Sequence, residues 1–497
     1  MKMIQKKLIN IFNIAFAGIF YYIWILAVGK MNLQSPMSAL LILPFFYLLY
    51  RIIKCERICH ISKMAKSWWI LQVVSFVIML IMAYQLRVMA TWDWGRLLLT
   101  AYNYTMTGEL DYPEYFMRHP NNQFWLVCLI AFFNMIHILT SDVDFYVYKG
   151  ISMIMGVLLV QIAILFIYKT AKLIWDEKRA LLVGIFALLY VPFYLYAMYL
   201  YSDTPGLCIA SLLIYCTTKL QKKQRSGKKS FFTIGIISIL ASLACYVKLF
   251  VFIIFVAIIV IGLLKNNIKS MIISIGVSAV FFGISYILIG NLTASCLQFD
   301  EQEAKCYEFP PTHWIMMALN TTGGFNQEDV DFSISYDTYD KKKEANIFKI
   351  KERLANMGVD GTVKHILYTK QIRTWADSCL GGDNYVSRKP IWEHSPCQEI
   401  FSINGKLHWL CLIYTWMIHI TILTGLVLSA ILSVRENVTK QKLLMERIAI
   451  LGLFLFLSIW ECNPRYLFTM IPAMILVASD GLFLASEKLR VCRFSRI

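Results

Sequence analysis

Long apolar runs separated by short polar links dominate the chain from end to end. A helix needs about 20 apolar residues to cross the hydrocarbon core of a bilayer, and a helix pairs all of its backbone polar groups there. The pattern therefore predicts an all-α polytopic membrane protein with about twelve transmembrane helices. The expected crossings are residues 8–29, 36–54, 67–89, 149–168, 180–200, 204–219, 231–246, 249–264, 271–290, 407–433, 446–460 and 465–486.

One further apolar run, residues 122–139, has the composition of a crossing, and the charge of the polar links decides its placement. Lys and Arg concentrate in loops that stay cytoplasmic. If 122–139 crossed, the link 219–229, with six basic and no acidic residues, and the basic residues of 435–447 would lie outside. We therefore expect 122–139 to dip into or lie along the outer surface of a plasma membrane, with both termini cytoplasmic.

Composition agrees with a membrane protein. Hydrophobic residues make up 58% of the 497 residues, which is above the fraction typical of soluble domains. The net charge of +17 would suggest a nucleic-acid partner in a soluble protein, but the positive-inside bias accounts for it here, so we expect no nucleic acid partner. The N-terminal MKMIQKK and its apolar continuation are similar to a signal peptide, but no small-residue cleavage site follows, so we expect a retained first crossing.

The segment 291–406 is polar, unlike the rest of the chain. It holds 16 of the 31 acidic residues and 13 basic ones. We expect a small, mainly helical external domain here, between a transmembrane region over 1–290 and C-terminal transmembrane helices over 407–497. The outer loop 90–148 would share its side of the membrane and could contribute to one site with it.

Four charged residues at predicted outer ends of crossings are candidates for chemistry. Asp93 lies between two tryptophans just after the third crossing, where a carboxylate is either a general base or an ordinary interfacial polar residue. Asp203 lies in a very short outer turn. Lys248 lies in a turn between two strongly apolar crossings and can bind a phosphate or reach toward headgroups. Arg465 opens the last crossing, and its planar guanidinium suits a phosphate.

The outer loop 90–148 holds further charged candidates. Glu109 lies on a Gly-containing stretch and is, by default, a solvated loop carboxylate. Arg118 and His119 precede the apolar run 122–139. A cation at this position can hold a lipid phosphate through charge-assisted hydrogen bonds, or it can anchor a surface helix to anionic lipid.

Four short patterns occur in a fixed order. They are Asp93 with Gly108-Glu109 and Arg118-His119-Pro120-Asn121-Asn122-Gln123-Phe124-Trp125, then Tyr199-Leu200-Tyr201-Ser202-Asp203, then Lys248, then Arg465-Tyr466-Leu467 with Pro472. In this order the chain resembles the C-type (GT-C) integral membrane glycosyltransferases, in particular the branch of protein O-mannosyltransferases and lipid A aminoarabinose transferases. The resemblance covers about 90–250 and 455–480. It departs from the family in having two extra crossings before the loop, no second carboxylate beside Asp93, and Leu249 after Lys248.

The resemblance implies transfer of a sugar from a polyprenyl-phosphate donor to a hydroxyl of a glycan, lipid or protein acceptor on the outer face, with inversion. Asp93 would be the base, and Arg465, Lys248 and Arg118 would hold the donor phosphate. Glu109, His119, Asp203 and Tyr466 would support them. No cofactor is implied with certainty, and a divalent cation stays open.

Two other functions also fit a multi-pass chain with an outer segment. A lipid-linked glycan polymerase or ligase would depend on Arg388 and His394 of the external segment rather than on Asp93. A transporter or flippase predicts charges at the bilayer midplane and broken helices in matched halves. The predicted crossings carry almost no such charge, which disfavours a transporter.

Overall fold

The computed structural model describes residues 2–55, 58, 60, 65–140, 144–225, 231–265, 268–434 and 441–494. Over these residues the chain is helical, apart from loops and one isolated bridge between Val88 and Pro390. The links 226–230 and 435–440, whose basic residues contributed to the predicted orientation, lie outside the described residues.

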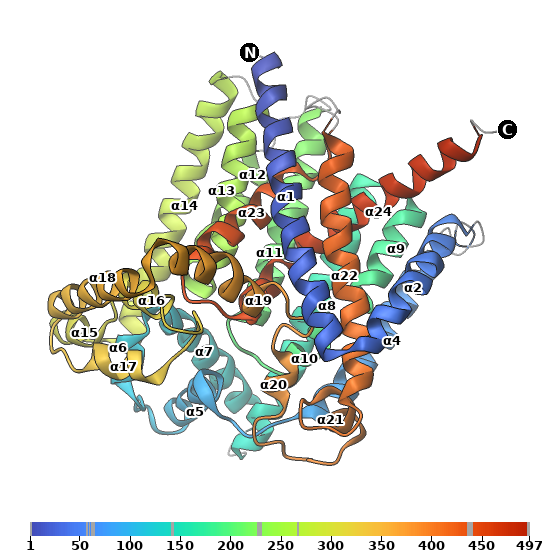
Figure 1. Cartoon of the computed structure of the whole chain (residues 1–497). Helices are drawn as coiled ribbons and strands as arrows, with labels where there is room; N and C mark the ends of the chain where they lie inside the picture. Colours follow the sequence, from blue (N-terminus) through green and yellow to red (C-terminus); the bar gives the residue numbers. More distant parts are fainter. Residues whose placement is uncertain are drawn as a thin grey trace.

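Long apolar helices form a bundle that fills the upper half of Figure 1. The N-terminal end of α1 and the C-terminal end of α24 both lie in this half, which agrees with the expectation that the termini share one side. The helices of the bundle are α1 (Lys2–Gln34), α2 (Pro36–Lys54), α4 (Ala65–Leu86), α8 (Phe145–Ile174), α9 (Glu177–Leu188), α10 (Val191–Ala197), α11 (Asp203–Arg225), α12 (Phe231–Val247), α13 (Leu249–Lys265), α14 (Ile268–Leu297), α22 (His408–Ser433), α23 (Leu444–Ile459) and α24 (Ile471–Phe494), which η3 (Pro464–Met470) precedes.

Eight of the described helices are long and apolar enough to cross a membrane, or nine if one bent pair forms a single crossing. The bent pair is α9 and α10, which meet at 52° within the predicted crossing 180–200, where Pro192 interrupts helical hydrogen bonding. The apolar helices α12 and α13 have 17 residues each and are shorter than a full crossing requires. Twelve crossings therefore stay a prediction.

The outer loop between α4 and α8 returns to the side from which it started. Lys149 Nζ at the start of α8 donates to Val88 O just after α4. At the other ends of these helices the rings of Trp68 and Tyr168 stack with centroids 3.9 Å apart, so α4 and α8 are antiparallel neighbours. The chain between them makes no net crossing, and this geometry favours the predicted placement of 122–139.

The loop itself folds into short helices at the lower end of the bundle in Figure 1. They are α5 (Trp92–Thr107), α6 (Pro113–Arg118), η1 (Pro120–Asn122) and α7 (Gln123–Thr140). The run 122–139 forms α7, which satisfies the length and composition of a crossing and packs against α5 and α14. Part of its apolar surface is therefore covered by protein, while Met135, Ile138 and Leu139 stay exposed.

Close packing and a polar network hold α22, α23 and α24 together. A Cβ at Gly481 would lie 2.0 Å from Gly425 O, so only glycine permits this crossing of α22 and α24. Ser429 Oγ donates to Asp480 Oδ2 over 3.0 Å, and Arg447 Nη1 donates to Ser429 Oγ over 2.8 Å. Asp480 and Arg447, the two charged residues of this network, are both buried.

The polar segment is helical and packs directly against the bundle. Helix α14 continues to Leu297, seven residues beyond the predicted border at 290. Lys370 Nζ donates to Ser458 O over 2.9 Å and to Trp460 O over 2.8 Å, which ties the segment to the end of α23. Its helices are α15 (Glu301–Tyr307), α16 (Pro311–Met317), α17 (Gln327–Ile334), α18 (Tyr339–Lys364), η2 (His365–Thr369), α19 (Lys370–Thr374), α20 (Gly382–Val386) and α21 (Pro396–Phe401).

Candidate functional site

Three charged residues from distant parts of the chain form a buried ion cluster. Asp203 begins α11, Lys248 occupies the break between α12 and α13, and Arg465 lies at the start of η3. Lys248 Nζ lies 2.7 Å from Asp203 Oδ1, and Arg465 Nε lies 3.4 Å from Asp203 Oδ2. The exposed fractions of these side chains are only 10%, 4% and 9% for Lys248, Asp203 and Arg465.

Local features of the sequence position the two cations. Asn463 Oδ1 accepts a hydrogen bond from Arg465 N over 3.0 Å and so starts η3 next to Pro464. A Cβ at Gly206 would lie 3.0 Å from Lys248 Cβ, so a glycine in the first turn of α11 lets the lysine approach Asp203 closely.

The cluster carries two positive charges and one negative charge. Burial lowers the pKa of Lys248, and the adjacent Asp203 opposes that shift. Leaving a buried charge without its partner costs about 3–5 kcal/mol, so Asp203 is needed for both cations to remain charged inside the protein. Two cations held this close together can also contact an anion, although the nearby carboxylates Glu461 and Asp93 share the same surroundings.

Aromatic rings surround Arg465. Its guanidinium carbon lies 5.1 Å from the ring centroid of Trp92, 5.2 Å from that of Tyr201 and 5.1 Å from that of Tyr385. Such cation–π contacts stabilise a desolvated guanidinium. Trp92 comes from the outer loop, Tyr201 from the turn before α11 and Tyr385 from the polar segment, so three separate regions meet at this one side chain.

Asp93 lies in the first turn of α5, beside the ion cluster. Burial raises the pKa of Tyr115, and the nearby Asp93 carboxylate, which is hydrogen bonded to the phenol, raises it further. Burial lowers the pKa of His119 to about 4, so its ring is neutral at pH 7, and Asp93 opposes this shift. The Asp93 carboxylate also raises the pKa of Lys248, against the effect of burial. The structure therefore brings Asp93 within electrostatic reach of the cluster.

A strained turn places Asp93. Trp92 has a left-handed backbone with φ of +48°, which is rare for a large side chain. A Cβ at Gly95 would lie 2.4 Å from the carbonyl carbon of Ala90, so glycine is required where α5 begins. This turn directs Trp92 toward Arg465 and Asp93 toward Tyr115.

Glu461 is a second buried carboxylate near the cluster. It accepts a hydrogen bond from Tyr466 Oη over 2.7 Å and is 3% exposed. Burial raises the pKa of Glu461, while Tyr466, Arg465, Arg373 and Lys248 oppose that shift. Tyr466, predicted as a supporting residue, therefore holds this carboxylate next to the two cations.

Comparison with known protein families shows which family the chain belongs to. Residues 5–482 match the family described as "Conserved hypothetical integral membrane protein". The chain belongs to this family. It is thus a multi-pass membrane protein, in agreement with its apolar helices. No curated protein and no solved structure matches it.

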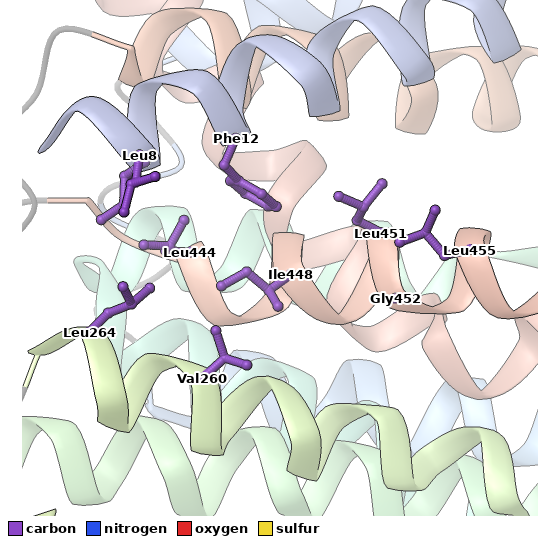
Figure 2. Close-up of a pocket in the computed structure, with 10 residues that line it drawn as sticks. Leu8, Phe12, Val260, Leu264, Leu444, Ile448, Leu451, Gly452 and Leu455 are labelled. Atoms are coloured by element: carbon purple, nitrogen blue, oxygen red, sulfur yellow. The ribbon is translucent and has the colours of Figure 1, made fainter. Parts of the chain in front are cut away.

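In this integral membrane protein an apolar groove lies between α1, α13 and α23 (Figure 2). Its volume is about 370 Å³, which is within the range of small-molecule sites. Aliphatic and aromatic side chains line it, with one glycine. These residues are Leu8, Ile9, Phe12, Val260, Leu264, Leu444, Ile448, Leu451, Gly452 and Leu455.

Other predicted site residues of the integral membrane protein lie apart from the cluster. Arg118 Cζ lies 5.7 Å from the ring of Phe309, so it faces the polar segment rather than Asp203. Glu109 is exposed, and its backbone N donates a hydrogen bond to Thr107 Oγ1. His119 lies within electrostatic reach of both Asp93 and Arg118, and its ring contacts the rings of Phe309 and Trp314.

Sequence reasoning missed three residues of the site. Glu461 precedes Arg465 by four residues, and this adjacency in the outer turn was an available signal. Tyr115 lies in the already selected loop 90–148. Tyr385 belongs to the polar segment, and no local pattern relates it to Arg465. Among the described residues, no three His, Cys, Asp or Glu side chains gather in a way that would hold a divalent cation.

Proposed function

We propose that this protein is a glycosyltransferase that moves a sugar from a polyprenyl-phosphate donor to an acceptor hydroxyl on the outer face of the membrane. The observation that carries the proposal is the buried Asp203–Lys248–Arg465 cluster beside Asp93. A sugar linked to a lipid through phosphate is a phosphodiester with one negative charge, and the cluster holds two cations, Lys248 and Arg465, on either side of Asp203.

The arrangement suits a single displacement at the anomeric carbon. Asp93 takes the proton from the acceptor hydroxyl as that oxygen attacks the sugar. The bond from the anomeric carbon to the phosphate oxygen breaks, and the lipid phosphate leaves with a second negative charge. Lys248 and Arg465 stabilise that developing charge in a site with little water. Attack opposite the leaving phosphate inverts the anomeric centre.

Asp203 leaves the guanidinium free to serve an anion. It contacts Arg465 through Nε, whereas the two terminal nitrogens form the fork that binds phosphate oxygens in a bidentate manner. Asp203 is therefore a positioning residue in this proposal. It keeps both cations charged and oriented before the donor arrives, which avoids the cost of assembling like charges during binding.

The apolar groove gives the lipid part of the donor a path toward the cluster. Leu455 lines the groove, and the next residue on α23, Phe456, has its ring 5.5 Å from that of Phe250. The Phe250 ring lies 5.7 Å from Lys248 Nζ. A polyprenyl chain in the groove would thus run along apolar side chains until its phosphate reaches the cations.

The polar segment would form the acceptor side. Trp314 stacks with Trp460 at 6.2 Å and lies near His119, so aromatic surface extends outward from the site. The polymerase or ligase alternative receives less support, because His394 pairs with Glu399 at the surface and is 82% exposed. A transporter would use charged residues inside the bundle. The buried charges Arg447 and Asp480 are instead joined to each other through hydrogen bonds with Ser429.

Asp93→Asn tests the proposal directly. In proteoliposomes supplied with polyprenyl-phosphate sugars, it should lower sugar transfer by about 10²–10⁴-fold, because the variant has no base for the acceptor hydroxyl. Glu114→Gln, an exposed acid in the same loop, should retain the wild-type rate. Wild-type transfer by a folded Asp93→Asn protein would show that Asp93 is not the base.

A second variant separates donor use from chemistry. Arg465→Lys keeps one positive charge but loses the planar fork, so we expect weaker donor binding with a smaller loss of turnover at saturating donor. The measurement is the dependence of the transfer rate on donor concentration. An unchanged donor dependence would remove Arg465 from the proposed phosphate site.

A further inference from the structure

An aromatic cluster next to the ion cluster contains polar groups that the protein leaves unused. We define it by Trp92, Trp94 and Tyr199, whose ring centroids lie 5.0 to 6.2 Å apart. Trp92 Nε1, Trp94 Nε1 and Tyr199 Oη are buried atoms without a hydrogen-bond partner among the described residues. A buried polar atom without a partner requires an explanation, and here three of them belong to neighbouring rings beside the ion cluster.

The cluster is nearly closed but has one open edge. Trp94 is 3% exposed and Tyr199 is 2% exposed, whereas Trp92 is half-buried. The half-buried Trp92 ring faces the Arg465 guanidinium at 5.1 Å. A group in contact with the Trp92 ring would therefore lie close to whatever anion the arginine holds.

The backbone supports the same interpretation. Trp92 keeps its left-handed φ of +48° although a β-branched or large residue normally avoids that region. Strained residues of this kind persist mainly at functional sites, where the surrounding packing holds a side chain in a required direction. Here the strain keeps the indole between Arg465 on one side and Tyr199 on the other.

We infer that the aromatic cluster of Trp92, Trp94 and Tyr199 binds the sugar ring of the lipid-linked donor. This inference rests on the proposed function and adds the location of the sugar to it. An indole N–H can only donate a hydrogen bond, so the ligand must present acceptor oxygens. A sugar presents several hydroxyl oxygens around an apolar ring face, and it is covalently attached to the phosphate that Arg465 would hold.

The ring faces and the hydrogen-bond donors have separate roles in this assignment. Ring faces favour contact with the C–H side of a sugar, while the two indole N–H groups and the phenol read its hydroxyl positions. Asp93 lies between Trp92 and Trp94 in the chain, so the sugar would be held at the base that activates its attacker. The same three residues would then select among sugars.

Tyr199→Phe gives the sharpest test, because it removes one hydroxyl and nothing else. If that hydroxyl has no partner in the unligated protein, its loss leaves stability unchanged or raises it. Affinity for a lipid-linked sugar should fall by about 5- to 10-fold, since a ligand hydrogen bond is lost. Trp94→Phe removes a second donor and should also weaken binding, but it leaves a cavity in the packed cluster and should lower stability as well.

Two tyrosines provide matched controls. The hydroxyl of Tyr190 is also buried and without a partner among the described residues, but it lies outside the cluster, so Tyr190→Phe should leave sugar affinity unchanged. Tyr196 Oη donates to Leu380 O over 2.7 Å, so Tyr196→Phe should lower stability. Only the Tyr199 variant should combine undiminished stability with weaker binding.

The experiment uses the full chain in nanodiscs, with binding measured by microscale thermophoresis. The probes are polyprenyl phosphate alone and polyprenyl phosphate carrying mannose, glucose, galactose or aminoarabinose. We expect at least one sugar to add affinity to the wild type, and Tyr199→Phe to lose that increment while binding the sugar-free lipid normally. Equal sugar increments in wild type and variant, or no increment from any sugar, would overturn the sugar site alone. Failure of the wild type to bind sugar-free polyprenyl phosphate would overturn the proposed function and the sugar site with it.

Discussion

Replacing Asp203 with Asn removes the carboxylate charge that contacts both Lys248 Nζ and Arg465 Nε. Lys248 and Arg465 then lose the carboxylate that contacts both of them, and Glu461 and Asp93 remain as the nearby acidic residues. Coulomb's law with an effective dielectric constant of about 20 assigns about 6 kcal/mol to a 2.7 Å contact and about 5 kcal/mol to a 3.4 Å contact. The two cations recover part of this electrostatic energy by rotating toward water. The expected loss is therefore about 3–5 kcal/mol of unfolding free energy.

Unfolding by SDS in mixed micelles, followed by circular dichroism, measures this loss. Asp337→Asn is the control, since Asp337 pairs with Lys341 at the surface and its replacement should leave the midpoint unchanged. The variant site has one more positive charge than the wild-type site, so dodecyl phosphate should stabilise Asp203→Asn more than the wild type. A wild-type midpoint for Asp203→Asn would refute the conclusion that the cluster is buried and paired.

Three further predictions concern packing, pH and the groove. Gly481→Leu should cost about 1–3 kcal/mol or more by forcing α22 and α24 apart, whereas Gly276→Leu, with open space around it, should be tolerated in the same SDS assay. Because burial raises the pKa of Glu461 above 4.5, its contribution to stability should be complete below pH 4.5 and be lost as pH rises through the raised pKa; Glu461→Gln should flatten that profile of unfolding midpoints. Leu455→Trp should weaken binding of a long-chain polyprenyl phosphate and spare geranyl phosphate, and equal effects on both lipids would argue against a chain in the groove.

Local sequence predicted the helices of the bundle well, with informative exceptions. Apolar runs mark the core of each crossing, but the run 180–200 is broken near Pro192 and α14 continues to Leu297. The polar Ser429–Asp480–Arg447 network was invisible to composition, since each of its residues looks unfavourable in a membrane until the partner is known. Charge in the links indicated where 122–139 should lie, and the antiparallel α4 and α8 favour the same placement.

The candidate site was predictable only in part. Asp93, Asp203, Lys248 and Arg465 stood out because each is a charged residue at the end of an apolar run. Arg118 stood out equally, yet it lies against Phe309 of the polar segment. Sequence position could not distinguish these cases, since the difference depends on how α6 and the polar segment pack together.

The amino-acid sequence by itself determined that the chain enters a membrane, which stretches do so, and which charged residues lie at their ends. These properties follow from local composition, because transfer of a helix into lipid depends on its own side chains. Only the tertiary structure decided that Asp203, Lys248 and Arg465 share one ion cluster and that Tyr385 and Trp92 enclose it. Such contacts join residues far apart in the chain, so they depend on helix packing and on the path of the outer segments, which no local pattern contains.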